Sequence, residues 1–378
     1  MNGKTNGLRT WIEIDTKALE NNLNEFRRYT ENKPKICAVA KSNAYGHSLV
    51  DYSKHMEKLG VDFFAVDSIT EALTLRKEGI KIPILVLGHT LPERLEEAVE
   101  NNISLTASSF DGLEHLEKFT EGHNPKIHIK IDTGMHRQGF QLEDMEKVFE
   151  KLKNNKGHFT LEGVYTHFAM AKNPAFPSFT KRQIGEFEVW KKKFEDSGYK
   201  VIFHASATSG TLLYPEAHYD MVRIGIGLYG EWPSVHVEGY TKSKINLKPA
   251  MSWKTVISEN KNINKGETVG YDCTETLARD SKIAVCPIGY WHGYPRALSA
   301  ISWVNVGGKK AKILGRVAMD MIVIDLTDIE NVKVGDEVEL LGKGDTCAPT
   351  ATELGVLADT INYEIITRTN PLIRKIYV

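Results

Sequence analysis

Residues 35–48 read KICAVAKSNAYGHS, and this stretch decides the fold. After Lys35 it continues with apolar and β-branched residues, as in a buried strand, and the run stops at Lys41. The following SNAYGHS contains a glycine among small polar residues, which is typical of a tight turn. A lysine at the C-terminal end of a buried strand indicates a parallel sheet whose functional residues lie at the ends of its strands.

Similar strand-like runs recur between about residue 10 and about residue 230, and amphipathic stretches separate them. The runs include KICAVA, DFFAVD, IPILVLG, KIHIKID, LEGVYTH, VIFHAS and MVRIGIGLYG. The helix-like stretches include EALTLRKEG, LPERLEEAVENN, LEDMEKVFEKLKNN and RQIGEFEVWKKKFEDSG. Repeated units of about 25 to 40 residues predict parallel strands covered by helices. Their number favours a (β/α)8 TIM-like barrel over an open doubly wound sheet, although the count alone does not separate the two.

After about residue 240 the pattern changes to short strands separated by turn clusters. The strand-like segments are MSWKTVISEN, SKIAVCPIGY, AKILGRVAM, MIVIDL and DEVELLG, and only TATELGVLADTI reads as a clear helix. We therefore predict an α/β barrel domain over residues 10–240 and a mostly β C-terminal domain over residues 241–378. Residues 1–14 are available to pair with the second domain.

Composition excludes several classes of function. Lysine plus arginine number 48 and aspartate plus glutamate 49, without a basic stripe, so neither nucleic acid nor an anionic membrane is an expected partner. We find no apolar signal core and no bilayer-spanning stretch. The cysteines show no metal-site or disulfide spacing, so we expect reduced thiols in a cytoplasmic protein and no metal; they are Cys37, Cys273, Cys286 and Cys347.

Several polar residues follow or lie within the strand-like runs of the predicted barrel. They are Lys41, His167, His204, Thr208 and Arg223. Strand alternation points Lys130, between IHI and ID, into the barrel or its mouth. Each alone has an ordinary explanation, such as packing for a histidine or solvation for a lysine. Together they predict one site at the barrel mouth, where a partly desolvated lysine amine can form a Schiff base.

Two glycine-containing segments could hold a phosphate beside that lysine. SNAYGHS supplies a tyrosine hydroxyl and a tight turn, and RIGIG supplies backbone N–H groups flanked by glycine. Close packing of a helix on a strand would explain RIGIG equally well, so this fragment alone does not decide.

Nine segments, in order along the chain, resemble the alanine racemase family. They are AVAKSNAYGH, KIDTGMHRQGF, VYTHFAMA, FHASATSGTL, YDMVRIGIGLYG, ETVGY, PIGYWHGYPRALS, GRVAMD and INYEI. The resemblance runs nearly end to end. It implies a pyridoxal 5'-phosphate enzyme that interconverts L- and D-alanine, with a barrel domain and a β domain. It also implies a head-to-tail homodimer with shared active sites, a small amino-acid substrate and a role in D-alanine supply for peptidoglycan.

The resemblance assigns roles to individual residues. Lys41 resembles the Schiff-base lysine and the base for the D-substrate, and Tyr271 resembles the opposing base for the L-substrate, donated by the partner chain. Arg137 and Met319, the latter also from the partner, match positions at the substrate carboxylate. Lys130 matches a lysine that is carbamylated in many members. The implied cofactor contacts are Lys41, Tyr45, His167, His204, Thr208, Arg223, Gly225, Ile226 and Tyr363, and the implied entryway residues are Tyr290, Trp291, His292 and Tyr294.

These roles are chemically coherent. Racemisation takes a proton from one face of the α-carbon and returns one to the other, so two bases must flank that carbon. Arg223 does not readily give up a proton, and beside the pyridine nitrogen it would keep that nitrogen unprotonated and favour return of the proton over transamination. A carbamate on Lys130 would replace a buried cation with an anion able to pair with Arg137. An ordinary salt-bridged lysine is the alternative.

The sequence departs from the usual family pattern in three places. Ala207 and Thr208 stand where an Asn-Ser pair is common, and Ile224 replaces a frequent proline. Trp291 and His292 stand where alanine and aspartate are usual, which puts substrate access in doubt. The alternatives are a racemase of serine, lysine or broad specificity, a non-catalytic pyridoxal-phosphate carrier, and a barrel-plus-β decarboxylase. Tyr363 and Tyr271 argue against the serine type and the carrier, respectively, and a decarboxylase's usual active-site cysteine has no clear counterpart.

Overall fold

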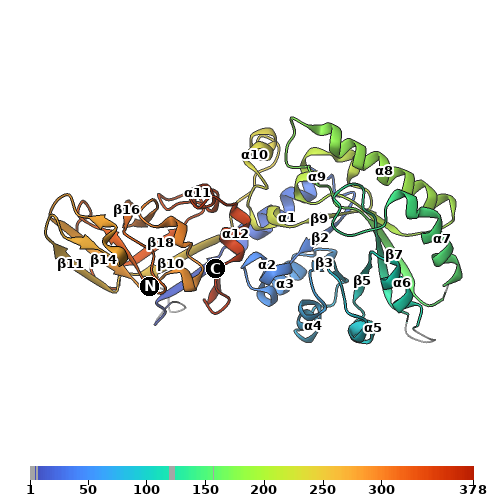
Figure 1. Cartoon of the computed structure of the whole chain (residues 1–378), viewed down its shortest axis with the longest axis horizontal. Helices are drawn as coiled ribbons and strands as arrows, with labels where there is room; N and C mark the ends of the chain where they lie inside the picture. The colour runs from blue at the N-terminus through green and yellow to red at the C-terminus, as the bar shows by residue number, and fades with distance from the viewer. Residues whose placement is uncertain (1–4, 6, 119–123, 156) are drawn as a thin grey trace. The chain divides into compact units, whose positions relative to one another are not determined.

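The computed structural model describes residues 5, 7–118, 124–155 and 157–378. It divides into two compact units (Figure 1). The barrel unit contains Leu19–Ala44 and Leu49–Leu247. The β unit contains the described residues before Leu19, the short segment Tyr45–Ser48, and Lys248–Val378.

An eight-stranded parallel sheet forms the centre of the barrel unit within the described residues. Its order is β8-β7-β6-β5-β4-β3-β2-β9, and each neighbouring pair is parallel. Between β8 and β9 an isolated parallel bridge joins Ala207 and Arg223, and Arg223 N donates to Ser206 O at 2.9 Å. The predicted barrel is thus confirmed. The strands are β2 (Lys35–Val39), β3 (Phe63–Val66), β4 (Ile84–Val86), β5 (Ser104–Ala107), β6 (Lys126–Lys130), β7 (Thr160–Tyr165), β8 (Ile202–His204) and β9 (Met221–Ile224).

Helices cover the outside of these strands, as Figure 1 shows for α4 to α8. In α8 the buried side chains Ile184, Phe187, Trp190 and Phe194 recur at helical spacing and form its inner face. The helices are α1 (Thr16–Tyr29), α2 (Lys41–Tyr45), α3 (Leu49–Lys58), α4 (Ile69–Lys77), α5 (Leu95–Glu100), α6 (Phe110–Leu116), α7 (Met145–Asn154), α8 (Pro177–Asp196), α9 (Thr208–Leu213) and α10 (Val235–Thr241). Short 3₁₀ turns are η1 (Pro92–Arg94), η2 (Leu142–Asp144), η3 (Pro215–Ala217) and η4 (Ile226–Tyr229).

The strand β5 has no counterpart among the seven strand-like runs quoted from the sequence. Its residues Ser104 and Thr106 break the apolar pattern, but both hydroxyls are satisfied inside the barrel. Ser104 Oγ donates to Glu162 Oε2 at 2.5 Å, and Thr106 Oγ1 donates to Val86 O at 2.8 Å. Tertiary hydrogen bonding therefore supports a strand that the local pattern does not indicate.

The β unit contains a nine-stranded sheet within the described residues, in the order β11-β14-β17-β16-β15-β18-β10-β1-β19. The N-terminal strand β1 (Thr10–Ile14) pairs antiparallel with β10 and parallel with β19. The other pairs in this sheet are antiparallel. The remaining strands are β10 (Met251–Val256), β11 (Glu259–Ile263), β12 (Thr268–Val269), β13 (Glu275–Thr276), β14 (Ser281–Cys286), β15 (Trp303–Val306), β16 (Lys309–Leu314), β17 (Ile322–Asp325), β18 (Glu337–Leu341) and β19 (Lys375–Tyr377).

Among its described residues the β unit also contains the helices α11 (Ala351–Leu357) and α12 (Asn362–Thr367) and the 3₁₀ turns η5 (Tyr271–Cys273), η6 (Tyr290–His292) and η7 (Arg296–Leu298). The units meet along the chain at Leu247 and Lys248, so residues 241–247, including the end of α10, group with the barrel. No helix in the described residues is both long and apolar enough to cross a membrane.

Gly163 in β7 offers a test of the barrel interior. A Cβ at this position would lie 2.2 Å from Nδ1 of the buried His128. We expect Gly163→Ala to lower the free energy of unfolding by about 1–3 kcal/mol, because the imidazole has to move in a packed core.

Gly185→Ala in α8 is the matched control, since its Cβ would meet open space. Replacing an exposed helical glycine should raise the free energy of unfolding by up to about 1 kcal/mol. Thermal and urea unfolding measure both variants, and equal stability of the two would contradict this packing.

Candidate active site

The amine of Lys41 lies at the C-terminal end of β2, where the sequence predicts it. The Lys41 side chain is 37% exposed, and its Nζ lies 3.6 Å from Oδ1 of Asp67, which follows β3. A lysine held at the end of a barrel strand with an open amine can react with an aldehyde that enters the mouth.

The backbone after Lys41 forms a left-handed turn, α2. Ser42, Asn43, Ala44 and Tyr45 have φ angles of 56°, 56°, 51° and 52°. For L-residues this conformation costs roughly 1–2 kcal/mol per residue. Two hydrogen bonds offset part of that cost, from Ala44 N to Ala40 O at 2.8 Å and from Leu49 N to Asn43 Oδ1 at 2.9 Å. Such concentrated strain is typical of functional sites.

Arg223 in β9 is only 2% exposed, and its guanidinium is held by neighbouring strand ends. Its Nη1 contacts His204 Nδ1 at 2.7 Å, and its Nη2 donates to Thr166 O and Ala205 O at 2.7 and 2.8 Å. Burial lowers the pKa of Arg223 to about 10, and among the described residues no carboxylate pairs with it. A guanidinium has five N–H groups, and these three bonds leave others for a ligand acceptor such as a ring nitrogen.

A chain of polar side chains continues from Arg223 through the barrel interior. His204 Nε2 lies 2.9 Å from His128 Nδ1, and His128 Nε2 lies 3.0 Å from Glu162 Oε2. Burial, followed by the charge of Arg223, holds the pKa of His204 well below its ordinary value. His204 is therefore neutral near pH 7, accepts from Arg223 through Nδ1 and donates through Nε2 to His128.

Sequence reasoning missed His128 and Glu162, which lie within the strand-like runs KIHIKID and LEGVYTH. The available signal was strand alternation. His128 lies between Ile127 and Ile129 and two residues before Lys130, so it belongs to the same face of the strand as Lys130. The hydrogen bond that connects the two residues becomes visible only when β6 and β7 pair.

His167 lies beside Arg223, with Nδ1 3.4 Å from Arg223 Nη2. Burial is the largest cause that holds the pKa of His167 well below its ordinary value, and the charges of Arg223 and Arg137 add to it. A neutral imidazole can pack against an uncharged aromatic ring without a desolvation penalty for charge.

Lys130 is buried, 5% exposed, at the end of β6. Its Nζ donates to Gln138 Oε1 at 3.1 Å and lies over the Tyr165 ring. Burial first, and then the charges of Arg137 and Arg223, lower the pKa of Lys130 to about 8. A pKa of about 8 leaves a minor neutral fraction near pH 7 that grows as the pH rises, and reaction with carbon dioxide needs this neutral form.

Arg137 is exposed in the loop after β6. The buried Asp132 shapes the start of this loop, because its Oδ1 accepts the backbone N–H groups of Gly134, Met135 and His136 at 2.9–3.0 Å. The loop geometry therefore fixes the backbone that leads into Arg137.

Thr208, at the start of α9, organises the backbone expected at a phosphate. Its Oγ1 accepts from Gly225 N at 3.2 Å and from Gly227 N at 3.4 Å, on either side of Ile226. A hydroxyl that accepts two bonds still has its proton to donate outward. A side chain at Gly227 would meet Phe26 at 2.6 Å, so this close approach requires glycine. With the open amine of Lys41 and the spare N–H groups of Arg223, these barrel residues fit pyridoxal phosphate.

The remaining predicted residues lie in the β unit. The rings of Tyr45 and Tyr363 are 6.2 Å apart, and burial raises the pKa of both, that of Tyr45 to about 12. Tyr271 in η5 is 69% exposed, and the adjacent Asp272 pairs with Arg316 at 2.7 Å.

The expected entryway segment lies against Met319. Trp291 N donates to Met319 O at 3.0 Å, and a Cβ at Gly289 would meet that same oxygen at 2.5 Å. Tyr290 and Trp291 are exposed together with Met319, whereas His292 and Tyr294 are buried. Of the four predicted entryway residues, only Tyr290 and Trp291 therefore have solvent-exposed side chains in the single chain.

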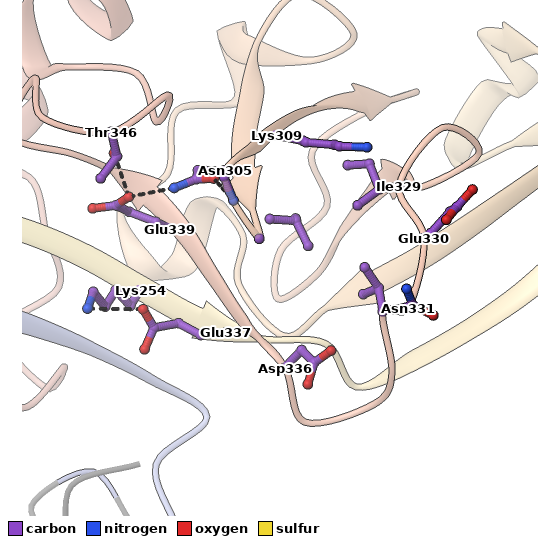
Figure 2. A pocket seen from close by; sticks show the side chains of 14 residues that line it. Lys254, Asn305, Lys309, Ile329, Glu330, Asn331, Asp336, Glu337, Glu339 and Thr346 are labelled. Carbon is purple, nitrogen blue, oxygen red and sulfur yellow. Dashed lines mark hydrogen bonds and ion pairs between the residues drawn. The ribbon is translucent and has the colours of Figure 1, made fainter.

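A separate cavity of about 710 Å³ lies in the β unit (Figure 2). Some of its charged groups are already bonded within the lining: Glu339 Oε2 accepts from Thr346 and Asn305, and Lys254 pairs with Glu337. The described residues that line it include none of the predicted site residues. No group of three or more metal-ligating side chains occurs in the part of the chain that the structure describes.

Comparisons with known proteins cover both units. Family models described as "Alanine racemase, N-terminal domain" and "Alanine racemase, C-terminal domain" match residues 14–233 and 250–377. The chain is 40% identical to an alanine racemase of Methanococcus maripaludis, over 97% of this chain and 98% of that protein. It is 37% identical to one of Symbiobacterium thermophilum, over 98% of each.

Solved structures agree with this assignment. The alanine racemase of Clostridium difficile 630 superposes with a TM-score of 0.92 at 34% identity, covering 98% of this chain and 96% of that one. The Bacillus anthracis alanine racemase with bound L-Ala-P superposes with a TM-score of 0.91 at 33% identity, covering 98% and 95%. The chain belongs to the alanine racemase family of pyridoxal-phosphate-dependent isomerases.

Proposed function

We propose that this protein interconverts L- and D-alanine, with Lys41 and Tyr271 as the two bases. The observation that carries the proposal is the open amine of Lys41 in the same barrel as a buried Arg223 that no described carboxylate neutralises. Full-length similarity to alanine racemases supports the choice of substrate. D-alanine supply for peptidoglycan, in the cytoplasm, belongs to the same proposal.

When bound, pyridoxal phosphate withdraws electrons from the substrate's α-carbon and so acidifies its α-hydrogen. Lys41 would hold the group covalently through Nζ, and its amine, once released, would accept or return a proton as one of the two bases. Arg223 would hold the ring nitrogen by a hydrogen bond without transferring its proton to it, which would favour return of a proton to the α-carbon. Thr208 Oγ1, which already accepts two amide bonds, donates its own proton to the phosphate.

Tyr271 is the base on the opposite face, supplied by a second copy of the chain. Its exposure, and that of Met319 at 54%, support this role, because both side chains are available to a partner. We therefore propose a head-to-tail homodimer in which each barrel mouth receives Tyr271 and Met319 of the partner subunit. Arg137 binds the substrate carboxylate.

Substrate assays test the function. The purified protein is incubated with pyridoxal phosphate and L-alanine, L-serine, L-lysine or L-arginine in deuterated water. Chiral chromatography follows the D-isomer and NMR follows the α-deuterium. We expect fast formation of α-deuterated D-alanine. Faster turnover of another amino acid would move the specificity to that substrate, and cofactor binding without racemisation would indicate a carrier and contradict the proposal.

Removing the hydroxyl of Tyr271 tests the second base. Tyr271→Phe should keep cofactor absorbance and lower kcat for L-alanine by about 10²–10⁴-fold, since a general acid–base group contributes about that much. Tyr240→Phe, another exposed tyrosine, is the control and should keep full activity. Full activity of Tyr271→Phe would exclude the two-base assignment.

The Lys130 amine should form a carbamate with carbon dioxide. The neutral amine adds to the carbon of CO₂, forming an N–C bond and releasing one proton. Because its pKa is about 8, the neutral fraction rises from about pH 6 to about pH 9, and the carbamate with it. The charges of Arg137 and Arg223, which disfavour an ammonium there, stabilise the anion.

We expect ¹³C-labelled bicarbonate to give a carbamate NMR signal that Lys130→Met abolishes. Lys375→Met is the control: burial likewise lowers the pKa of Lys375 to about 8, but its Nζ contacts only backbone carbonyls among its described hydrogen-bond partners. A signal that persists in Lys130→Met and disappears in Lys375→Met would contradict the assignment.

A further inference from the structure

The carboxylate of Glu71, in the first turn of α4, contacts the backbone of two βα loops. Its Oε2 accepts from Asp67 N at 2.9 Å and from Ser68 N at 3.3 Å, and Ser68 Oγ in turn accepts from Glu71 N at 3.2 Å. This reciprocal pair is a capping box that begins the helix.

The second carboxylate oxygen of Glu71 makes a hydrogen bond that is not part of the capping box. Oε1 accepts from Ser42 N at 2.7 Å, and Ser42 is the residue directly after Lys41. One side chain on the loop after β3 therefore also binds the loop after β2. A charged acceptor makes a short, strong hydrogen bond to an amide.

Both loops that Glu71 binds lie beside the Lys41 amine. Ser42 N opens the left-handed turn α2, so the bond from Glu71 fixes the backbone at the point where the chain enters a disfavoured conformation. On the other side, Asp67 carries the carboxylate that lies 3.6 Å from Lys41 Nζ. The single carboxylate of Glu71 thus binds the backbone next to Lys41 and the backbone of Asp67, the ion-pair partner of Lys41.

The turn has its own bonds, from Ala44 N and from Leu49 N, but both lie after Ser42. Ser42 is exposed, so without Glu71 its amide would bind water, which does not define a direction. Glu71 is therefore the described contact that orients the start of the turn.

We propose that Glu71 is a positioning residue for Lys41, holding the left-handed turn so that the amine meets the cofactor and the α-carbon in one orientation. This inference rests on the proposed function, because it assigns Lys41 the reactive amine. Glu71 itself is not proposed to touch the cofactor or the substrate; it acts through the backbone of Ser42 and Asp67.

Glu71→Gln tests the proposal. An amide offers one acceptor oxygen and one NH₂ donor in place of two acceptors, so it cannot serve both loops. We expect cofactor affinity and kcat each to fall by about tenfold, with KM for L-alanine changed by less than about twofold, because a misplaced base lowers turnover more than substrate binding. Hydrogen exchange of the peptide that contains Ser42 should accelerate in the cofactor-free protein.

Two controls separate positioning from loss of a helix cap. Ser68→Ala removes the other half of the same capping box without touching Ser42, and Glu353→Gln disrupts a capping box in α11, where Glu353 Oε2 accepts from Thr350. Both should reduce thermal stability yet keep the cofactor affinity and the exchange of the Ser42 peptide. If Glu71→Gln matches these controls in affinity, kcat and exchange, the positioning role is excluded.

Failure of the proposed function has a different signature. Lys41→Ala should abolish covalent attachment of the cofactor in an otherwise intact Glu71 protein. If Lys41→Ala still binds the cofactor covalently, the reactive amine is elsewhere and the assignment of Lys41 is wrong. If Lys41→Ala behaves as expected and Glu71→Gln does not, only the positioning role fails.

Discussion

The hydrogen bonds of the Arg223 guanidinium hold together both the barrel and its site. Arg223 lies in β9, and its bonds run to His204 at the end of β8, to Ala205 directly after it and to Thr166 after β7. These contacts add to the few backbone contacts at the junction of β8 and β9, which include the isolated bridge and a bond from Asp220 N to Phe203 O at 3.0 Å, so a buried cation reinforces the closure of the sheet. Among the described residues no carboxylate pairs with this buried cation, and its unused N–H groups are available to a ligand acceptor.

Burial and a local group of cations together explain the shifted pKa values of several groups in the barrel unit. The charges of Lys41, Arg137 and Arg223 add to burial in lowering the pKa of Lys130 and of His167. Neutral imidazoles and a partly neutral lysine are therefore consequences of burial first, and of the positive field of these cations second. That field favours anions, and the phosphate of the cofactor, the substrate carboxylate and a lysine carbamate are all anionic.

Much of the barrel and its reactive centre could be predicted from the sequence. Strand-like runs that end at polar residues located Lys41, and alternation placed Lys130 inside, because the period of a strand is a local property. The family resemblance is confirmed, and with it the barrel-plus-β architecture and dependence on pyridoxal phosphate. The roles of individual residues stay predictions.

What the sequence did not reveal depends on contacts between distant segments. The strand β5 needs Glu162 and Val86 to satisfy its hydroxyls, and the His128–His204 contact needs strands brought together by closure. The left-handed turn after Lys41 contains four consecutive non-glycine residues with positive φ, Ser42, Asn43, Ala44 and Tyr45, so propensity argues against it. Its support comes in part from Oε1 of Glu71, which accepts from Ser42 N across two loops that lie 29 residues apart in the sequence.

The most direct test of this account is to locate the amine that carries the cofactor. The protein, loaded with one equivalent of pyridoxal phosphate, is reduced with borohydride to make the linkage permanent, then digested and mapped by tandem mass spectrometry. The account predicts a phosphopyridoxyl group on Lys41, with Lys130 unmodified by it. Attachment at Lys130 or at another lysine, with Lys41 free, would contradict the assignment of the reactive centre to the end of β2.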